Sequence, residues 1–203
     1  MILKVEIDKD YASELLEVVS DNNVFEWYWN DATTIEYKRT GVLDSKTLDT
    51  PQFTHILFSN GKVHSNFYHF FSEMFSIIEK EFGCKIKNVI RVKANLMTKD
   101  ACYPDGFYNG AHTDSHNDNI FTFLYYVNDS DGDTIFFSDF LDGNKDHNIT
   151  ELVEVHRETP KCGTGLIFKS NQLHTPTPPK YSNRRIVVNY VFEIENETNN
   201  TKL

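Results

Sequence analysis

The sequence predicts a mainly β domain, a sandwich or barrel, with helices that pack against one sheet. From residue 88 onward apolar side chains recur with a period of two, and turns rich in Gly, Asp, Asn and Pro separate the strand-like runs. Short strands punctuated in this way are typical of β-sandwiches and barrels. Residues 65–82 carry a phenylalanine-rich stripe at three- and four-residue spacing, which ends at Gly83. This stripe predicts a helix that buttresses the sheet, so the class is α+β with a dominant β part.

The remaining elements are expected in the following order. A strand near the start leads into a helix that is capped by Asp8 or Asp10 and runs to about Val19. Residues 22–53 hold aromatic clusters without a clear period, and we expect them to pack in the core or to form a lid. The strands are expected at residues 1–7, 88–96, 120–127, 133–138, 151–157, 164–169 and 185–194.

The length of 203 residues fits one domain. We expect this domain to cover residues 1–194, with a helical and β support region at 1–87 and a β core at 88–194. Residues 195–203 are polar and poor in apolar side chains, which predicts a flexible tail.

The composition excludes several classes of protein. A formal net charge of −10 and a sequence pI near 5.2 repel phosphate backbones, which argues against a nucleic-acid partner. Three widely spaced cysteines without a C-x-x-C pair fit neither a disulfide framework nor a structural zinc site. No apolar run approaches the roughly 18 residues that suggest a membrane span, and no signal peptide is visible. A cytoplasmic location is therefore expected, without a membrane partner, and the oligomeric state is left open.

A His-x-Asp sequence is the strongest candidate for chemistry. Successive side chains of a strand alternate between its faces, so His112 and Asp114 would point to the same place. His174 follows after several strands and supplies a second imidazole. Two imidazoles and one carboxylate on one side of a metal leave the opposite positions open, which is the arrangement of non-haem Fe(II) oxygenases. We therefore predict His112, Asp114 and His174 as Fe(II) ligands.

The open metal positions can take a 2-oxo acid and dioxygen. A dicarboxylate such as 2-oxoglutarate (2OG) also needs a cation, and the planar fork of Arg binds both oxygens of a carboxylate. On the last strand, alternation places Arg185 and Asn189 on one face and Arg184 on the other. Asn189 adds a second polar group to the first face. We therefore predict that Arg185 binds the co-substrate, with Arg184 as the alternative.

Several motifs then resemble the Fe(II)- and 2OG-dependent dioxygenases, in particular the prolyl-hydroxylase-like branch. Tyr103-Pro104-Asp105-Gly106 precedes the His-x-Asp as a Tyr-Pro-x-Gly element does in oxygen-sensing prolyl hydroxylases, and Leu124-Tyr125-Tyr126-Val127-Asn128 is similar to their Tyr-Tyr-Leu-Asn strand. Residues 160–168 resemble the turn and strand that lead to the distal His. The resemblance covers about residues 88–194. The layout is also similar to that of compact oxygenases encoded by marine bacteriophages, for which the host cytoplasm would be the location.

The resemblance implies a double-stranded β-helix (jelly roll) with helices on one side. It implies Fe(II), 2OG and O2 as cofactor and co-substrates, with ascorbate as an optional reductant. It places Tyr126 against the distal carboxylate of 2OG. We also assign Tyr103 and Asn189 to the co-substrate site. The implied reaction hydroxylates a C–H bond of a peptide or protein, with prolyl as the commonest choice, or of a small molecule. One departure is Asp131-Gly132-Asp133, where the branch has Gly-Gly.

Two alternatives belong to other classes. A cupin-like metalloenzyme that uses no 2-oxo acid would not need a buried Arg on its last strand. A jelly-roll binding or structural module without a working metal site would not need the complete set of His112, Asp114, His174 and Arg185. The presence of this set favours the dioxygenase.

Overall fold

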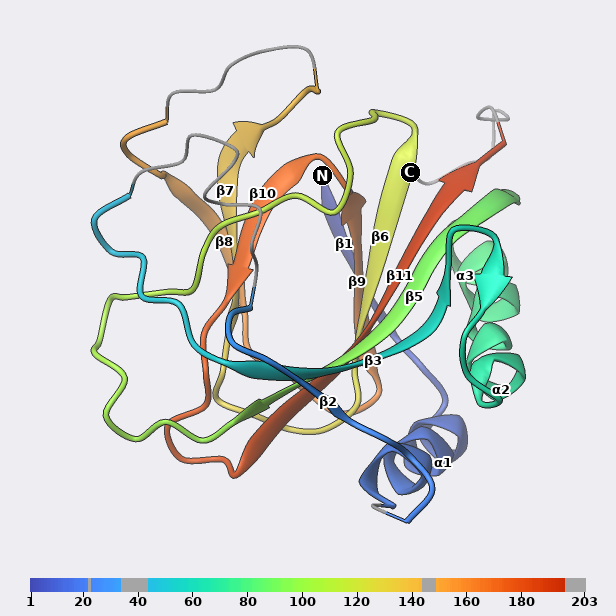
Figure 1. Ribbon diagram of the computed structural model, residues 1–203. Coiled ribbons are helices and arrows are strands. Elements are labelled where there is room, and N and C mark those ends of the chain that lie inside the picture. The colour runs from blue at the N-terminus through green and yellow to red at the C-terminus, as the bar shows by residue number, and fades with distance from the viewer. Residues whose placement is uncertain (22, 34–43, 144–148, 196–203) are drawn as a thin grey trace.

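The computed structural model describes residues 1–21, 23–33, 44–143 and 149–195. Two antiparallel sheets face each other, which confirms the mainly β fold (Figure 1). The larger sheet has the order β1-β9-β6-β11-β5-β3-β2, with β4 paired to β3, and the smaller sheet has the order β10-β7-β8. Of the predicted tail only Glu195 is described; residues 196–203 lie outside the described part of the protein.

The larger sheet draws strands from the whole length of the chain. Its members are β1 (Ile2–Glu6), β2 (Tyr28–Asn30), β3 (Gln52–Ser59), β4 (Lys62–Val63), β5 (Ile86–Thr98), β6 (Ile120–Tyr126), β9 (Thr164–Lys169) and β11 (Arg184–Ile194). The smaller sheet contains β7 (Thr134–Phe140), β8 (Glu154–Glu158) and β10 (Gln172–Pro176). Strands β2, β3, β4 and β10 were not expected from the local pattern. The region 1–87 therefore supplies strands of the larger sheet as well as helices.

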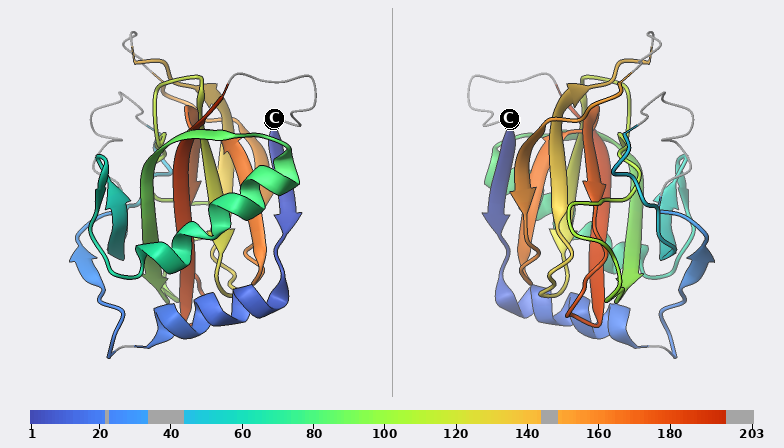
Figure 2. Two further views of the ribbon diagram at one scale, coloured as in Figure 1. Left: turned by 90° about the vertical axis from the view of Figure 1, so that its right-hand side faces the viewer. Right: turned by 90° about the vertical axis from the view of Figure 1, so that its left-hand side faces the viewer.

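Helices cover only one face of the larger sheet, as Figure 2 shows. They are α1 (Lys9–Ser20), α2 (Tyr68–Ser72) and α3 (Met74–Phe82). At the start of α1, the Asp8 carboxylate accepts a hydrogen bond from the backbone N–H of Asp10 at 2.8 Å, so Asp8 is the cap. None of the helices in the described residues is long and apolar enough to cross a membrane.

The helix predicted over residues 65–82 is divided in two, which corrects the prediction of one continuous helix. It starts only at Tyr68 and is interrupted at Glu73. There the backbone N–H of Glu73 donates to the Phe70 carbonyl, so the hydrogen bond closes over three residues and tightens the turn. The predicted end is confirmed, since Gly83 adopts the left-handed conformation with φ 64°.

The phenylalanine stripe and the strands build the core together. Phe71, Met74, Ile78 and Phe82 are buried against the outer face of the larger sheet. On β11, the side chains that join this core alternate with those that point toward the smaller sheet. The core members are Ile186, Val188, Tyr190 and Phe192, and the inward members are Arg185, Val187 and Asn189. The period of two thus separates a dry face from a polar one on the same strand.

We predict that Gly165→Ala destabilises the fold. A Cβ at Gly165 would overlap the ring of Phe123, which is fully buried on the neighbouring strand β6. Overpacking of this kind costs about 1–3 kcal/mol. In urea unfolding the midpoint should fall while the slope m stays unchanged. Gly143→Ala is the control, because among the described residues a Cβ there meets only the His116 side chain, at an ordinary 3.4 Å. Equal midpoints for the two variants would contradict the packing argument.

Candidate active site

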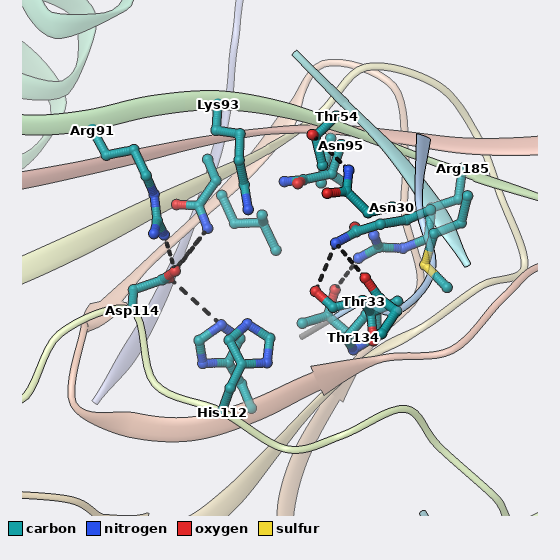
Figure 3. Close-up of a pocket in the computed structure, with 18 of the residues that line it drawn as sticks. Asn30, Thr33, Thr54, Arg91, Lys93, Asn95, His112, Asp114, Thr134 and Arg185 are labelled. Atoms are coloured by element: carbon teal, nitrogen blue, oxygen red, sulfur yellow. Dashed lines mark hydrogen bonds and ion pairs between the residues drawn. The ribbon is translucent and has the colours of Figure 1, made fainter. Parts of the chain in front are cut away.

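A cavity of about 370 Å³ lies between the two sheets (Figure 3). Strands β5 and β11 contribute alternate side chains to its wall, and the loop after Gly110 and strand β10 close it from the other side. Side chains from β2 and β3 complete the wall. The residues from β5 are Arg91, Lys93, Asn95 and Met97, and those from the first 60 residues are Asn30, Asp31, Ala32, Thr33, Gln52, Thr54 and Ile56.

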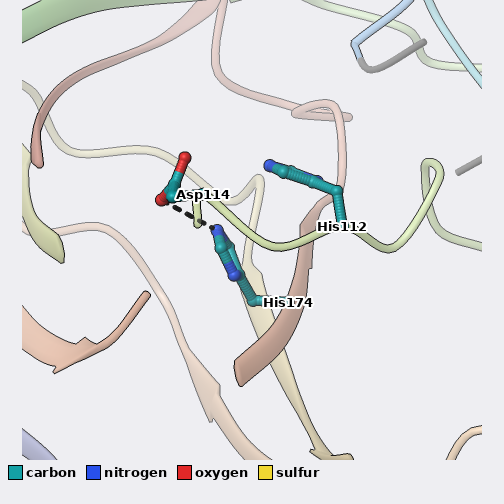
Figure 4. A group of neighbouring side chains, drawn as sticks. All are labelled: His112, Asp114 and His174. Carbon is teal, nitrogen blue, oxygen red and sulfur yellow. Dashed lines mark ion pairs between the residues drawn. The ribbon is translucent and has the colours of Figure 1, made fainter. Parts of the chain in front are cut away.

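The three predicted metal ligands lie together at this cavity (Figure 4). Their candidate ligand atoms are all within 4.8 Å of one another. The backbone explains why: His112 and His174 form an antiparallel bridge with two N–H···O hydrogen bonds of 3.0 Å, so both side chains project to the same side. The backbone N–H of Asp114 is fixed by the Ser170 carbonyl at 2.9 Å.

The two imidazoles are oriented for metal binding. Nδ1 of His112 lies 3.2 Å from the Gly110 carbonyl, and Nδ1 of His174 lies 2.9 Å from the Gln172 carbonyl. A carbonyl can only accept, so each Nδ1 carries the proton and donates. This orientation turns Nε2 of both rings away from these carbonyls, and Nε2 is the nitrogen that would ligate a metal in the neutral imidazole.

Burial holds His112 in this neutral form. It lowers the pKa of His112 to about 3, and repulsion from His174 adds to the effect. Metal binding at His112 therefore does not have to displace a proton near neutral pH.

The Asp114 carboxylate is buried and accepts hydrogen bonds from three side chains. Arg91 forms an ion pair with Oδ1 through Nη2. Asn189 donates to both oxygens at 3.2 Å, and Thr122 donates to Oδ2 at 2.9 Å. Burial opposes ionisation, but Arg91 and the two histidines outweigh it and hold the pKa of Asp114 well below its usual range. The ionised Oδ2 lies 3.6 Å from Nε2 of His174.

These donors fit a divalent ion such as Fe(II). Two imidazole nitrogens and one carboxylate oxygen lie close together, and each of the three residues is held by a further hydrogen bond. This is the ligand type and the supporting shell that such an ion prefers.

Arg185 lies in the same cavity and is buried. Its Nε donates to the Gly132 carbonyl at 2.8 Å and its Nη2 donates to Thr134 Oγ1 at 2.7 Å. No carboxylate of the described residues lies within ion-pair distance of it, and burial lowers its pKa. A buried guanidinium without an anion fits the distal carboxylate of 2OG.

The single glycine of Asp131-Gly132-Asp133 is required at this point. A Cβ on Gly132 would lie 2.6 Å from the Thr177 carbonyl oxygen and 3.0 Å from Cδ of Arg185. Gly132 thus allows the loop to come close to Arg185 and accept its hydrogen bond. Although this chain has one glycine where the branch has two, that glycine, Gly132, stands at the position where a side chain would not fit.

The other predicted co-substrate residues have different surroundings. Arg184 points to the helical side, where it donates to Ser20 Oγ at 2.9 Å. Tyr126 donates to Thr134 Oγ1 at 2.8 Å, and its ring centroid lies 5.9 Å from Cζ of Arg185. Tyr103 donates to the Leu48 carbonyl at 2.8 Å. Neither tyrosine is among the described residues that line the cavity, so their roles in co-substrate binding stay predictions.

Residues 99–193 match the family model of the 2OG-Fe(II) oxygenase superfamily. This part of the protein is a 2OG-Fe(II) oxygenase domain. It contains the three predicted metal ligands and Arg185, and members of the superfamily are oxidoreductases that use Fe(II) and 2OG. A search of curated protein sequences gave no match.

Solved structures resemble this chain over nearly its whole length. An oxidoreductase of the 2OG-Fe(II) oxygenase family from Burkholderia pseudomallei is 14% identical with a TM-score of 0.60, covering 98% of this chain and 88% of its own. A Pseudomonas putida prolyl-4-hydroxylase is 13% identical with a TM-score of 0.54, covering 96% and 92%. The non-heme alpha ketoglutarate dependent epimerase SnoN from nogalamycin biosynthesis is 10% identical with a TM-score of 0.60, covering 95% and 78%. At these identities the likeness establishes the double-stranded β-helix fold.

The sequence did not single out the Arg91 ion pair or the wall from β2 and β3. For Arg91 a signal was present, because residues 91, 93 and 95 form the polar face of an alternating strand. For β2 and β3 the local pattern had no period. Their place depends on pairing, because β3 pairs with β5, which is remote in sequence, and β2 pairs with β3.

We predict that His112→Ala lowers the affinity for a divalent metal by more than about 100-fold, because loss of a ligand should exceed the effect of losing a supporting hydrogen bond. Anaerobic titration with Co(II), followed by visible absorption, measures this directly. His116→Ala is the matched control, since His116 lies in the same loop, is exposed and is not part of the ligand group. Equal affinity in the two variants would contradict the ligand assignment.

Proposed function

We propose that this oxygenase hydroxylates a C–H bond of its substrate while 2OG is decarboxylated to succinate. One atom of O2 enters the new hydroxyl group and the other enters the succinate carboxylate, so a C–H bond and the bond to the departing CO2 are broken. The observation that carries the proposal is Arg185: a buried guanidinium faces the cavity that also holds His112, Asp114 and His174. A cupin-like enzyme without a 2-oxo acid would have no use for it.

The side chains divide the work between two ends of the cavity. Arg185 would bind the distal carboxylate of 2OG, with its fork held in place by Gly132 and Thr134. His112, Asp114 and His174 would hold Fe(II), which supplies the oxidising chemistry once 2OG and O2 are bound. Val187, two residues after Arg185 on the same face of β11, and Leu124 add apolar surface to the cavity and would limit the access of water to the bound dicarboxylate.

Asp114 needs its particular neighbours for this role. With Oδ1 paired to Arg91, Oδ2 is the oxygen that faces His174. Asn189 and Thr122 keep the carboxylate plane fixed. The carboxylate would therefore offer one oxygen to the metal and leave the remaining positions to 2OG and O2.

Two observations bear on the class of substrate that is hydroxylated. The motifs of the prolyl-hydroxylase-like branch support a peptide or protein side chain, with prolyl as the first choice. The small cavity supports a small molecule or a single inserted side chain.

We predict that Arg185→Ala weakens 2OG binding by about tenfold or more, because a hydrogen-bonded ion pair contributes roughly 1.5–3 kcal/mol. Anaerobic titration of Fe(II)-loaded protein with 2OG, followed through the visible metal-to-ligand charge-transfer band, measures the affinity. Arg184→Ala is the matched control and should bind 2OG like the unaltered protein, since Arg184 points to Ser20.

The titration also decides between the classes of protein. A stronger loss in Arg184→Ala than in Arg185→Ala would overturn the co-substrate assignment. Absence of the band in the unaltered protein, with metal bound, would favour a cupin-like enzyme, and absence of metal binding would favour a non-catalytic module.

A further inference from the structure

Unmet hydrogen-bonding capacity is concentrated at the cavity. Buried polar side chains in folded proteins almost always have a partner. In the described residues eleven buried side-chain polar atoms have none, and four of these belong to residues that line the cavity. They are Nε of Arg91, Oδ1 of Asn95, Oγ1 of Thr113 and Oδ1 of Asn189. A ligand in the cavity can supply the missing partners.

Three of these atoms belong to neighbouring residues of strands β5 and β11. Arg91 and Asn95 line the cavity from β5 (Figure 3), and Asn189 of β11 pairs with residue 93, which lies between them. Asn189 is therefore the diagonal neighbour of both, at a Cα separation of about 7–8 Å. Together they offer one unused donor, Nε of Arg91, and two unused acceptors, the amide oxygens.

Asn95 is the member of this group whose whole amide is unused. Among the described residues its side chain has no hydrogen-bond partner, whereas Asn189 donates to Asp114 and Arg91 forms an ion pair with Asp114. The terminal torsion of an asparagine side chain is broad, so the amide can turn its oxygen and nitrogen toward a ligand at little cost. Asn95 thus offers a donor and an acceptor on one planar edge.

The co-substrate cannot supply what the two amide oxygens lack. Ionised 2OG has a keto group and two carboxylates, so it accepts hydrogen bonds and donates none. Its predicted path from Arg185 to the metal ligands passes Val187, which pairs with Asn95 across the two strands. The donors for Asn95 and Asn189 therefore come from the second substrate, bound beside 2OG.

The same atoms select the chemistry of that substrate. A carboxylate has no donor for the amide oxygens, and an ammonium group has no acceptor for Nε of Arg91. A carboxamide has both, and because its C=O and N–H lie on one edge it can form two parallel hydrogen bonds with the Asn95 amide. A peptide group in its usual trans form has its C=O and N–H on opposite sides.

The cavity also limits the size of the substrate. At about 370 Å³ it is near the lower end of small-molecule sites, and the co-substrate occupies part of it. The remaining space suits a single side chain that ends in a carboxamide.

We propose that the hydroxylated group is an asparagine or glutamine side chain whose carboxamide is held by Asn95. This inference rests on the 2OG-dependent hydroxylation proposed above, and it makes Asn95 the residue that determines the specificity. A C–H bond of the carbon chain that carries the carboxamide becomes C–OH, with the oxygen atom from O2, while 2OG is converted to succinate and CO2.

The test uses the full-length protein loaded with Fe(II) and 2OG. The probes are L-glutamine and L-asparagine, free or capped as acetyl methylamides, so that a free amino acid and a residue of a peptide are distinguished. Under argon the shift of the charge-transfer band measures binding. In air, succinate and a product heavier by one oxygen atom measure turnover.

We expect at least one of these carboxamides to shift the band and to be hydroxylated. The matched probe is the methyl ester of the same side chain, which keeps the size and the acceptor but has no donor. It should need a concentration about tenfold or more higher, because hydrogen bonds to Asn95 are lost.

The variants assign this preference to Asn95. Asn95→Ala should raise the half-saturating concentration of the active carboxamide about tenfold or more and remove the discrimination against its methyl ester. The affinity for 2OG alone should not change. The control is Asn88→Ala, which removes an exposed asparagine of the same strand outside the cavity and should behave like the unaltered protein.

Other outcomes overturn the inference. Equal binding of the carboxamide to the unaltered protein and to Asn95→Ala would remove Asn95 from substrate recognition. A weaker affinity of Asn95→Ala for 2OG would assign Asn95 to the co-substrate. A capped prolyl peptide or cytosine that shifts the band better than any carboxamide would reject the carboxamide as the recognised group.

Failure of this inference is distinguishable from failure of the proposed function. No response to any carboxamide, with the 2OG band intact, would reject the substrate class and leave the proposed function standing. Absence of the band in the unaltered protein would reject the proposed function itself.

Discussion

A buried carboxylate, that of Asp114, is the feature on which the geometry of the site depends. Removing a carboxylate from water is costly unless donors replace the lost hydration. Here the donors come from three adjacent strands of the larger sheet: Thr122 from β6, Asn189 from β11 and Arg91 from β5. The strand order of the sheet is therefore what assembles the surroundings of this predicted metal ligand. His174 approaches from the smaller sheet, so the carboxylate also lies where the two sheets meet.

The same strands serve two environments. On β11 the face toward the helices is apolar and packs in the core, while the face toward the cavity carries Arg185 and Asn189. The helices cover the apolar face of the larger sheet and so bury its hydrophobic side chains. The opposite face can then carry the polar side chains of the site. The phenylalanine-rich helices α2 and α3 thus contribute to the site without touching it.

Local sequence patterns were sufficient to predict much of the fold and of the candidate site. Alternation along β11 separated Arg185 from Arg184, and the spacing of His112 and Asp114 put them on one side. Three features depended on more than the local pattern. The helix break at Glu73 reflects a local change in hydrogen bonding that the apolar stripe does not encode. Strand β10 and the wall from β2 and β3 exist through pairing with remote strands, and their own residues show no strong period.

The ion pair between Arg91 and Asp114 also depends on tertiary contacts. Alternation identified Arg91 as part of a polar face, but its partner is fixed only when the loop that carries Asp114 is tied to Ser170. Which charged side chains pair in a buried site depends on which segments of the chain come together. A single sequence shows the charged residues but not which of them form ion pairs.

Both edge strands of the larger sheet, β1 and β2, come from the first 30 residues of the sequence. Strand β1 pairs with β9, so that Ile2 lies opposite Phe168. This contact closes a very long loop, and such non-local pairing slows folding. During synthesis β1 must wait for most of the protein to be made before its partner leaves the ribosome. Until then the edge of the growing sheet is open to other strands, which makes the interval before β1 docks the stage at which aggregation competes with folding.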